Sequence, residues 1–453
     1  MSLLIKGATI INEGRSFVGS LLVLRDKIQK IYSDEEPLPL ADEVLEASGL
    51  WLLPGAIDDQ VHFREPGALH KACIASESAA AVAGGVTSFM DMPNNQPPCC
   101  SLNQWEYKMN RAAATSYANY AFYMGADNHN IDEIKKIDPK RIPGVKVFMG
   151  SSTGNMLVDD PQTLARIFAE SPVLIATHCE DEALIQANLK AFREQYRNRE
   201  DEIPVSAHPQ IRSREACLKS TQKAVELALQ HGSRLHVLHI TTKEEVALLA
   251  EVQKTHFKGM PLPLITAEVC VHHLFFCDTD YARYGNLIKC NPAIKSSEDR
   301  QALRQAVKDG VIRVVATDHA PHTWEEKQLP YIKAPSGLAL IQYSLPLMLQ
   351  MARDGIFTFE EVIEGMCHAP ARNFGVQGRG FIREGYQADL VMIDPQTPTP
   401  TDEEPRYACG WSPLAQTALS LSVYKTFING SCAYSQDQGL VSQRFAQALT
   451  FSQ

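Results

Sequence analysis

The chain has 453 residues and a formal net charge of −10, with 45% hydrophobic and 21% charged residues. This is the composition of a folded globular protein with a large core, and it excludes a long disordered tail. The acidic balance, without a run of Lys and Arg, argues against nucleic acid as a partner. One or two well-placed arginines would still suffice to bind a small anion.

The cysteine usage and the N-terminus predict a cytoplasmic protein with reduced thiols. The 11 cysteines form no C-x-x-C pair, and the adjacent Cys99 and Cys100 do not have the spacing of a zinc ribbon. Residues 1–20 contain no basic segment followed by a long apolar run. No window reaches the roughly 18 apolar residues of a membrane span, so we expect no membrane contact.

In chain order, the first predicted element is a β-meander over residues 3–31, where short apolar runs alternate with turn residues. From Trp51 to Ala371, β-rich runs alternate with stretches of helical period, which is typical of βαβ units. The predicted strands are residues 51–62, 86–90, 119–124, 145–149, 173–178, 234–240, 265–271 and 312–317. The predicted helices include residues 71–83, 102–114, 161–169, 214–230, 242–255 and 297–308.

Eight alternations of strand and helix predict an α/β protein with a (β/α)8 TIM-like barrel over residues 51–374. Turn-punctuated strands return after residue 371, in GRGFIREGYQADLVMID and YKTFINGSCAY. Both ends of the chain are therefore rich in strands. The simplest arrangement is a small β domain formed from both chain termini, residues 1–50 plus 375–453, beside the barrel.

Five side chains that suit a metal lie at the predicted strand ends, where the reactive groups of such a barrel gather. They are His62 on the first strand, Lys146 on the fourth, His178 on the fifth, His239 on the sixth and Asp318 after the eighth. A lone histidine at a strand end is more often a hydrogen-bonded structural residue. Five such residues on one rim favour ligation of a metal of the Zn²⁺ type.

Lys146 requires a separate argument, because a protonated ammonium group repels a metal. A buried lysine loses its proton readily, and the neutral amine can take up carbon dioxide to become a carbamate. The carbamate is an anionic oxygen donor that can bridge two metals. The alternative is an ordinary salt-bridged lysine, which we would favour if the other four residues were absent.

Several motifs resemble those of the dihydroorotases of the amidohydrolase superfamily. They are PGAIDDQVHFREPG at residues 54–67, AGGVTSFMDMPNN, LHVLHITT, KCNPAI and TDHAPH, with GYQADLVMID and CGWSP near the end. The resemblance covers nearly the whole chain. It implies a distorted (β/α)8 barrel and a pair of zinc ions held by His62, His178, His239 and Asp318, with carboxylated Lys146 as the bridge.

The resemblance also implies which residues bind the substrate, namely His62, Arg64, Asn94, Asn291 and His322. A guanidinium beside the metal suits a substrate with a carboxylate, because its planar fork holds that group bidentately. Structural alternatives stay open: turn positions for the two asparagines and a surface ion pair for Arg64.

Three further histidines lie beside the motifs: His272, His273 and His319. We expect them to pack against the site or to support its ligands.

One position departs from the pattern of the superfamily, whose members usually carry H-x-H at the end of the first strand. Gln60 stands where the first of these histidines is expected. Its neutral amide oxygen is a weaker ligand for a borderline metal than an imidazole nitrogen. Three outcomes stay open: Gln60 coordinates through oxygen, water replaces the missing ligand, or one metal is held tightly.

The activity that the resemblance implies is the reversible interconversion of N-carbamoyl-L-aspartate and (S)-dihydroorotate, a step of pyrimidine biosynthesis. As a hypothesis, Asp318 is the catalytic residue: it accepts a proton from the attacking water and delivers it to the departing nitrogen. The alternatives are a dihydropyrimidinase- or allantoinase-like enzyme and a non-catalytic scaffold. Arg64 favours the first assignment, because the other rings carry no carboxylate at that position. We expect a homodimer, and an association with aspartate transcarbamoylase stays open.

Overall fold

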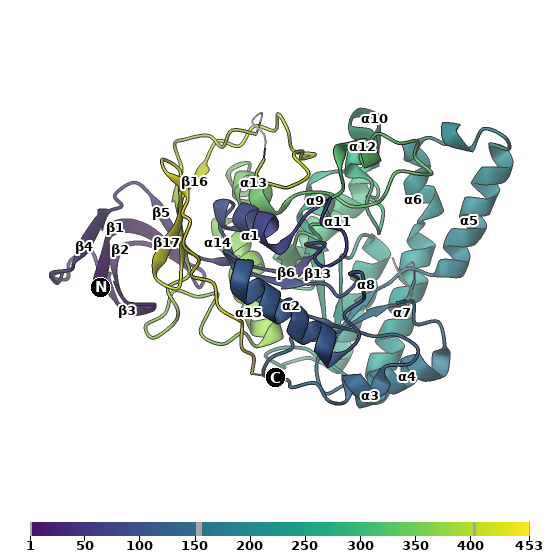
Figure 1. Ribbon diagram of the computed structural model, residues 1–453, viewed down its shortest axis with the longest axis horizontal. Coiled ribbons are helices and arrows are strands. Elements are labelled where there is room, and N and C mark those ends of the chain that lie inside the picture. The colour runs from purple at the N-terminus through teal and green to yellow at the C-terminus, as the bar shows by residue number, and fades with distance from the viewer. Residues whose placement is uncertain (1, 151–155, 402–404, 453) are drawn as a thin grey trace.

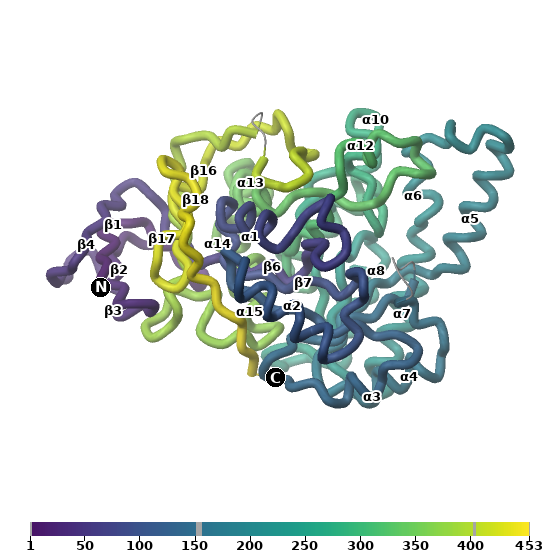
Figure 2. Tube along the Cα trace, viewed as in Figure 1, coloured from purple at the N-terminus to yellow at the C-terminus, as the bar shows by residue number. Residues whose placement is uncertain are grey.

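The computed structural model describes residues 2–150, 156–401 and 405–452. A β-sheet built from both ends of the chain lies at one end of the long axis, and a barrel surrounded by helices occupies the rest (Figures 1 and 2). The chain begins in the sheet and ends below the contact between the two parts. Within these ranges, none of the helices is long and apolar enough to cross a bilayer.

The terminal sheet has nine strands, of which eight follow the order β18-β17-β16-β15-β5-β1-β2-β3 and β4 pairs with β1. The N-terminal strands are β1 (Ser2–Asn12), β2 (Arg15–Leu24), β3 (Lys27–Ser33), β4 (Glu43–Glu46) and β5 (Trp51–Pro54). The C-terminal strands are β15 (Leu390–Asp394), β16 (Ser422–Ile428), β17 (Ser431–Ser435) and β18 (Gly439–Leu440). The predicted meander is present as the antiparallel strands β1, β2 and β3. The exact domain boundaries stay a prediction, and β5 pairs with both terminal segments.

The barrel is built from parallel strands, and the predicted fold class is confirmed. Its strands are β6 (Ala56–Val61), β7 (Val86–Asp91), β8 (Asn119–Phe122), β9 (Met124–Gly125), β10 (Val145–Phe148), β11 (Ile175–His178), β12 (Leu235–Val237), β13 (Ile265–Cys270) and β14 (Val314–Ala316). They form two parallel sheets, β6-β7-β8 and β9 to β14 in sequence. Only Tyr123 separates β8 from β9, so these two act as one bent strand. The ring closes where the His62 amide donates to the His319 carbonyl at 2.8 Å.

The six predicted helices form close to the expected positions, because polar residues cap their starts. They are α1 (Ile74–Ala83), α2 (Leu102–Thr115), α4 (Pro161–Glu170), α7 (Arg214–His231), α8 (Lys243–His256) and α11 (Ser297–Lys308). The remaining helices are α3 (Ile131–Ile134), α5 (Glu182–Gln195), α6 (His208–Ile211), α9 (Val271–Phe275), α10 (Tyr281–Tyr284), α12 (Trp324–Lys327), α13 (Ile341–Arg353), α14 (Phe359–Ile363) and α15 (Ala369–Phe374). One large apolar core joins the barrel strands to these helices, and a smaller core lies within the terminal sheet.

The prediction of one strand over residues 51–62 is wrong in one respect, because the segment is two strands that belong to different sheets. Gly55 separates β5, in the terminal sheet, from β6, in the barrel. The amide of Gly55 donates to the Asp389 carbonyl at 2.9 Å, so the backbone passes close to its neighbours here. A Cβ at this position would lie 2.1 Å from the Thr87 Oγ1. The switch between sheets therefore requires glycine.

We expect Gly55→Ala to lower the free energy of unfolding by about 1–3 kcal/mol, because the added methyl overlaps the side chain of Thr87. Urea unfolding of the variant against the wild type measures this. In a Thr87→Gly background the same substitution should cost clearly less, since the overlapping atoms are gone. An equal loss in both backgrounds would contradict the steric explanation.

Candidate active site

The nine predicted site residues all line one cavity of about 220 Å³ at the C-terminal ends of the barrel strands. They are His62, Arg64, Asn94, Lys146, His178, His239, Asn291, Asp318 and His322. The wall is completed by Gln60, Phe148, Ala320, Pro335, Ser336 and Gly337. The predicted convergence is therefore observed, while the role of each residue stays a prediction.

His62 and Asp318 face each other across this cavity, with His62 Nε2 at 3.0 Å from Asp318 Oδ1. On its other side, His62 Nδ1 lies 2.7 Å from Asn94 Oδ1, which accepts its proton. In a neutral imidazole the lone pair then lies on Nε2 and faces the carboxylate. The lone pairs of His62 Nε2 and of the Asp318 carboxylate then face each other and repel. A cation bound between them would remove this repulsion.

His178 and His239 also face each other in the cavity, with His178 Nδ1 at 3.0 Å from His239 Nε2. His178 Nε2 lies 2.9 Å from Glu180 Oε2, so the proton is fixed on the side away from His239. The Nδ1 of His239 has no hydrogen-bond partner within the described ranges. Burial lowers the pKa of both histidines, and the neutral form is the one that binds a metal.

The carboxylate of Glu180 is held in turn by Arg212, which donates to the same oxygen. Burial alone would raise the pKa of Glu180. Arg212 and His178 outweigh that effect and hold the pKa at about 2. Glu180 therefore stays ionised, fixes the ring of His178 and acts as an indirect support for a ligand.

Lys146 lies in the middle of β10 with an exposed fraction of only 1%. Burial lowers the pKa of its ammonium group to about 8, against the opposing effect of Asp318. About one tenth of Lys146 is therefore a neutral amine at pH 7, compared with well under one thousandth for an ordinary lysine, and this is the form that reacts with carbon dioxide. The uncharged amine that the predicted carbamate requires is therefore present.

These donors fit a divalent metal of the zinc type. Three imidazoles and the carboxylate of Asp318 surround a site beside the buried Lys146, whose amine becomes an oxygen ligand when it is carboxylated. Three residues of the site also have left-handed backbone angles: φ is 64° at Arg64, 41° at His239 and 47° at Asp318. Such angles are costly for residues other than glycine and cluster at functional sites, where they direct side chains.

Arg64 and His322 form the polar end of the cavity. Arg64 donates through Nε to the Pro321 carbonyl at 3.0 Å, and its Nη2 lies 3.1 Å from His322 Nε2. Lys71 Nζ lies 3.0 Å from His322 Nδ1 and 2.8 Å from Glu326. Burial and the neighbouring Arg64 and Lys71 lower the pKa of His322, which is therefore neutral.

The structure adds supporting residues that the sequence analysis did not name. Asp58 Oδ2 accepts from the Thr317 hydroxyl at 2.6 Å, and Asp58 Oδ1 accepts from the Thr317 amide at 3.2 Å. This contact ties β6 to the end of β14, one residue before Asp318. The spacing contains a signal for it, because Asp58, Gln60 and His62 alternate along one strand.

Gln60 lies within the site, at the position where the superfamily pattern has histidine. Its amide nitrogen donates to Asp318 Oδ1 at 3.3 Å. Its Oε1 accepts from the Cys270 thiol, with Sγ at 4.0 Å. Gln60 thus orients the carboxylate of Asp318 in this structure.

The expected packing role fits His319. Its Nε2 lies 2.6 Å from Glu77 Oε2, and its Nδ1 accepts from the Leu340 amide at 3.0 Å. Both nitrogens are thus used within the protein.

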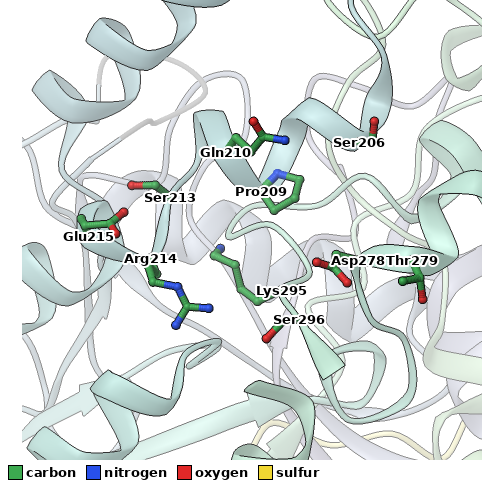
Figure 3. A pocket seen from close by; sticks show the side chains of 10 residues that line it. All are labelled: Ser206, Pro209, Gln210, Ser213, Arg214, Glu215, Asp278, Thr279, Lys295 and Ser296. Carbon is green, nitrogen blue, oxygen red and sulfur yellow. The ribbon is translucent and has the colours of Figure 1, made fainter. Parts of the chain in front are cut away.

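A larger cavity of about 510 Å³ lies outside this site (Figure 3). It is lined by residues of α6 and of the starts of α7 and α11, and by none of the nine predicted residues. Its cations are satisfied within the protein: Arg214 lies 2.7 Å from both Glu244 and Asp299, and Lys295 donates to the Ala293 carbonyl at 2.9 Å. We therefore place the chemistry in the smaller cavity.

Comparison with known proteins assigns the family, since residues 51–432 match the profile of the Amidohydrolase family. The chain belongs to the amidohydrolase family. A dihydroorotase from Methanosarcina acetivorans is 31% identical over 404 residues, which cover 87% of this chain and 84% of the relative. An allantoinase from Bacillus velezensis is 30% identical over 444 residues, 96% of this chain and 94% of the relative.

Among solved structures, the L-hydantoinase (dihydropyrimidinase) from Arthrobacter aurescens superposes with a TM-score of 0.92 at 25% identity, covering 99% of each chain. The predicted resemblance to dihydroorotases is confirmed, and the chain belongs to a hydrolytic, metal-dependent class of cyclic amidohydrolases. Because allantoinase and hydantoinase are similarly close, the specific substrate must be argued from the site.

We expect Lys146 to take up carbon dioxide. Incubation with carbon-13 bicarbonate should give a protein carbamate signal by NMR, and that signal should increase as the pH is raised from 7 towards 8. The reason is that the neutral fraction of an amine with a pKa of about 8 grows over that interval. Lys146→Ala should abolish the signal, whereas Lys289→Ala should keep it. A signal of equal size in Lys146→Ala would contradict the assignment.

Proposed function

We propose that this chain is a zinc-dependent dihydroorotase, which interconverts N-carbamoyl-L-aspartate and (S)-dihydroorotate in pyrimidine biosynthesis. The proposal depends mainly on the position and the unpaired charge of Arg64. Its guanidinium lines the cavity, and within the described ranges it forms no ion pair with a carboxylate of the protein. A partly buried guanidinium without an internal counter-ion calls for an anionic ligand, and dihydroorotate supplies a carboxylate.

The environment of Arg64 supports this choice of substrate. Nε and Nη2 are occupied by the Pro321 carbonyl and by His322, which fix the plane of the guanidinium and leave Nη1 for a ligand. Lys71 lies at the same end of the site, but its charge is balanced by Glu326, so Arg64 is the cation that faces the cavity there. Hydantoin, dihydrouracil and allantoin lack a ring carboxylate that could pair with the guanidinium of Arg64.

The other cavity residues have complementary tasks. Asn291 Oδ1 has no hydrogen-bond partner in the described part of the chain, so it is available to accept a ring N–H of the substrate. Asp318, oriented by Gln60, takes the proton of the attacking water and returns it to the departing ring nitrogen. The cavity of about 220 Å³ is smaller than the ~300–1,000 Å³ that drug-sized ligands need, and it suits one small ring.

His62, His178, His239, Asp318 and carboxylated Lys146 would hold the zinc. When bound there, zinc polarises the amide carbonyl and makes water acidic enough to react near neutral pH. The protein contributes the orientation: Asn94 and Glu180 fix the tautomers of His62 and His178, so that a lone pair of each is directed inward.

The substrate assignment is tested by assaying dihydroorotate, dihydrouracil, hydantoin and allantoin side by side with zinc-loaded enzyme. We expect dihydroorotate to have the highest kcat/KM. Arg64→Ala should raise the KM for dihydroorotate roughly 10- to 100-fold, the value of a lost charged hydrogen bond, with a smaller effect on kcat. Preference for a ring without a carboxylate, or an unchanged KM in the variant, would overturn the assignment.

Asp318→Asn should lower kcat by roughly 10²- to 10⁴-fold, because the amide cannot carry the proton between water and leaving group. The fold and part of the metal content should persist, which circular dichroism and elemental analysis would show. Asp309→Asn, on the surface at the end of α11, is the matched control and should leave turnover unchanged. Full activity in Asp318→Asn would remove this residue from its proposed role.

A further inference from the structure

A second group of side chains that suit a metal lies behind the cavity, where β13 runs into α9. Cys270 ends the strand, and His272 and His273 lie in the first turn of the helix. The Cys270 Sγ and one ring nitrogen of each histidine lie within 4.8 Å of one another. The exposed fractions of the three residues are 0%, 1% and 3%. We expected these histidines to pack or to support the site, but their contacts suggest a more specific role.

The histidine nitrogens in this group are incompletely hydrogen-bonded. Within the described ranges, the Nδ1 of His273 has no hydrogen-bond partner. Neither ring nitrogen of His272 makes a hydrogen bond of normal geometry with any described residue, although the backbone of Thr317 lies close enough to oppose the lowering of its pKa by burial. Leaving buried polar atoms without partners costs free energy, and such atoms require an explanation. Packing alone does not supply one, since a leucine or phenylalanine would fill the same space without that cost.

The proton on His273 is already positioned as in a metal-binding histidine. Its Nε2 lies 3.2 Å from the Pro292 carbonyl, which can only accept, so the proton lies on Nε2. The lone pair is then on Nδ1, the nitrogen without a partner. Metal-ligating histidines commonly donate their other N–H to a backbone carbonyl in this way. Burial lowers the pKa of His273 to about 4, so the ring is neutral at pH 7.

We propose that Cys270, His272 and His273 form a second binding site, separate from the donor set in the cavity, for a thiophilic divalent transition metal. One thiolate and two imidazoles select metals such as zinc over calcium or magnesium, which prefer oxygen. Binding forms a metal–sulfur bond and releases the thiol proton of Cys270 to solvent, with no change in oxidation state.

Gln60 connects this site to the cavity. Its Oε1 lies 4.0 Å from the Cys270 Sγ, and its Nε2 lies 3.3 Å from Asp318 Oδ1. Gln60 lines the cavity, so its side chain lies between an ion in the cavity and Cys270. The residue that departs from the superfamily pattern therefore touches both donor sets.

Another buried group, Asp59, His236 and Glu268, also has ligand atoms within 4.8 Å of one another. There the histidine is satisfied within the protein: Nδ1 lies 2.9 Å from the Thr266 hydroxyl, and Nε2 lies 3.2 Å from Glu268. Hydrogen bonding accounts for this group, so the group at β13 and α9 is the stronger candidate.

Cobalt(II) tests the proposal, because a thiolate bound to cobalt gives a charge-transfer absorption in the near ultraviolet and the cavity donors contain no sulfur. Metal-stripped full-length protein is titrated with Co²⁺, with bound cobalt quantified after gel filtration. We expect this absorption to saturate with one equivalent beyond those bound in the cavity. Cys270→Ser should remove both the absorption and that equivalent, while Cys217→Ser, at another buried thiol, should keep both.

Absence of the absorption in the wild type at saturating cobalt, or an undiminished absorption in Cys270→Ser, would overturn the proposal. His273→Gln provides a second variant should Cys270→Ser fail to fold by circular dichroism, and it too should lose the extra equivalent. The readout is independent of dihydroorotate turnover, so the failure of this site and the failure of the proposed function are distinguishable.

Discussion

The feature on which the rest of the structure depends is the set of inward-facing nitrogen and oxygen donors at the mouth of the barrel. His62 faces Asp318 and His178 faces His239, each pair at 3.0 Å. Such contacts are unfavourable unless a cation or a proton lies between the partners. Asn94 and Glu180 fix the outer protons and so prevent the two inner rings from turning away. The surrounding polar network therefore favours a bound metal.

The barrel makes this arrangement possible at a cost to its own stability. Parallel strands bring residues far apart in the chain to one rim, and the left-handed angles of His239 and Asp318 direct their side chains inward. Lys146 is buried in the fourth strand, where its charge is disfavoured. These costs are offset by the large apolar core between the strands and the helices. The same arrangement leaves the guanidinium of Arg64 at the open end, where it can receive an anion.

Much of this could be predicted from the sequence, because strand and helix periods are local properties. The eight barrel strands and six of the helices lie where the apolar patterns place them. The strand ends and the motifs together identified nine of the residues that line the cavity. The break at Gly55 was missed because WLLPGAIDDQV is one apolar run, and only the approach of Thr87 shows that it changes sheets. Asp58 was missed because its partner, Thr317, is 259 residues away. Orphaned nitrogens such as the Nδ1 of His273 become visible only when the packing is known.

We infer that a metal binds between the paired donors at the barrel mouth. The most direct test of this inference is anomalous diffraction from crystals of zinc-loaded protein, with data collected on both sides of the zinc absorption edge. We expect a peak within bonding distance of His178, His239 and Asp318. A cavity without an anomalous peak in fully loaded crystals, with these side chains hydrogen-bonded to one another instead, would contradict it.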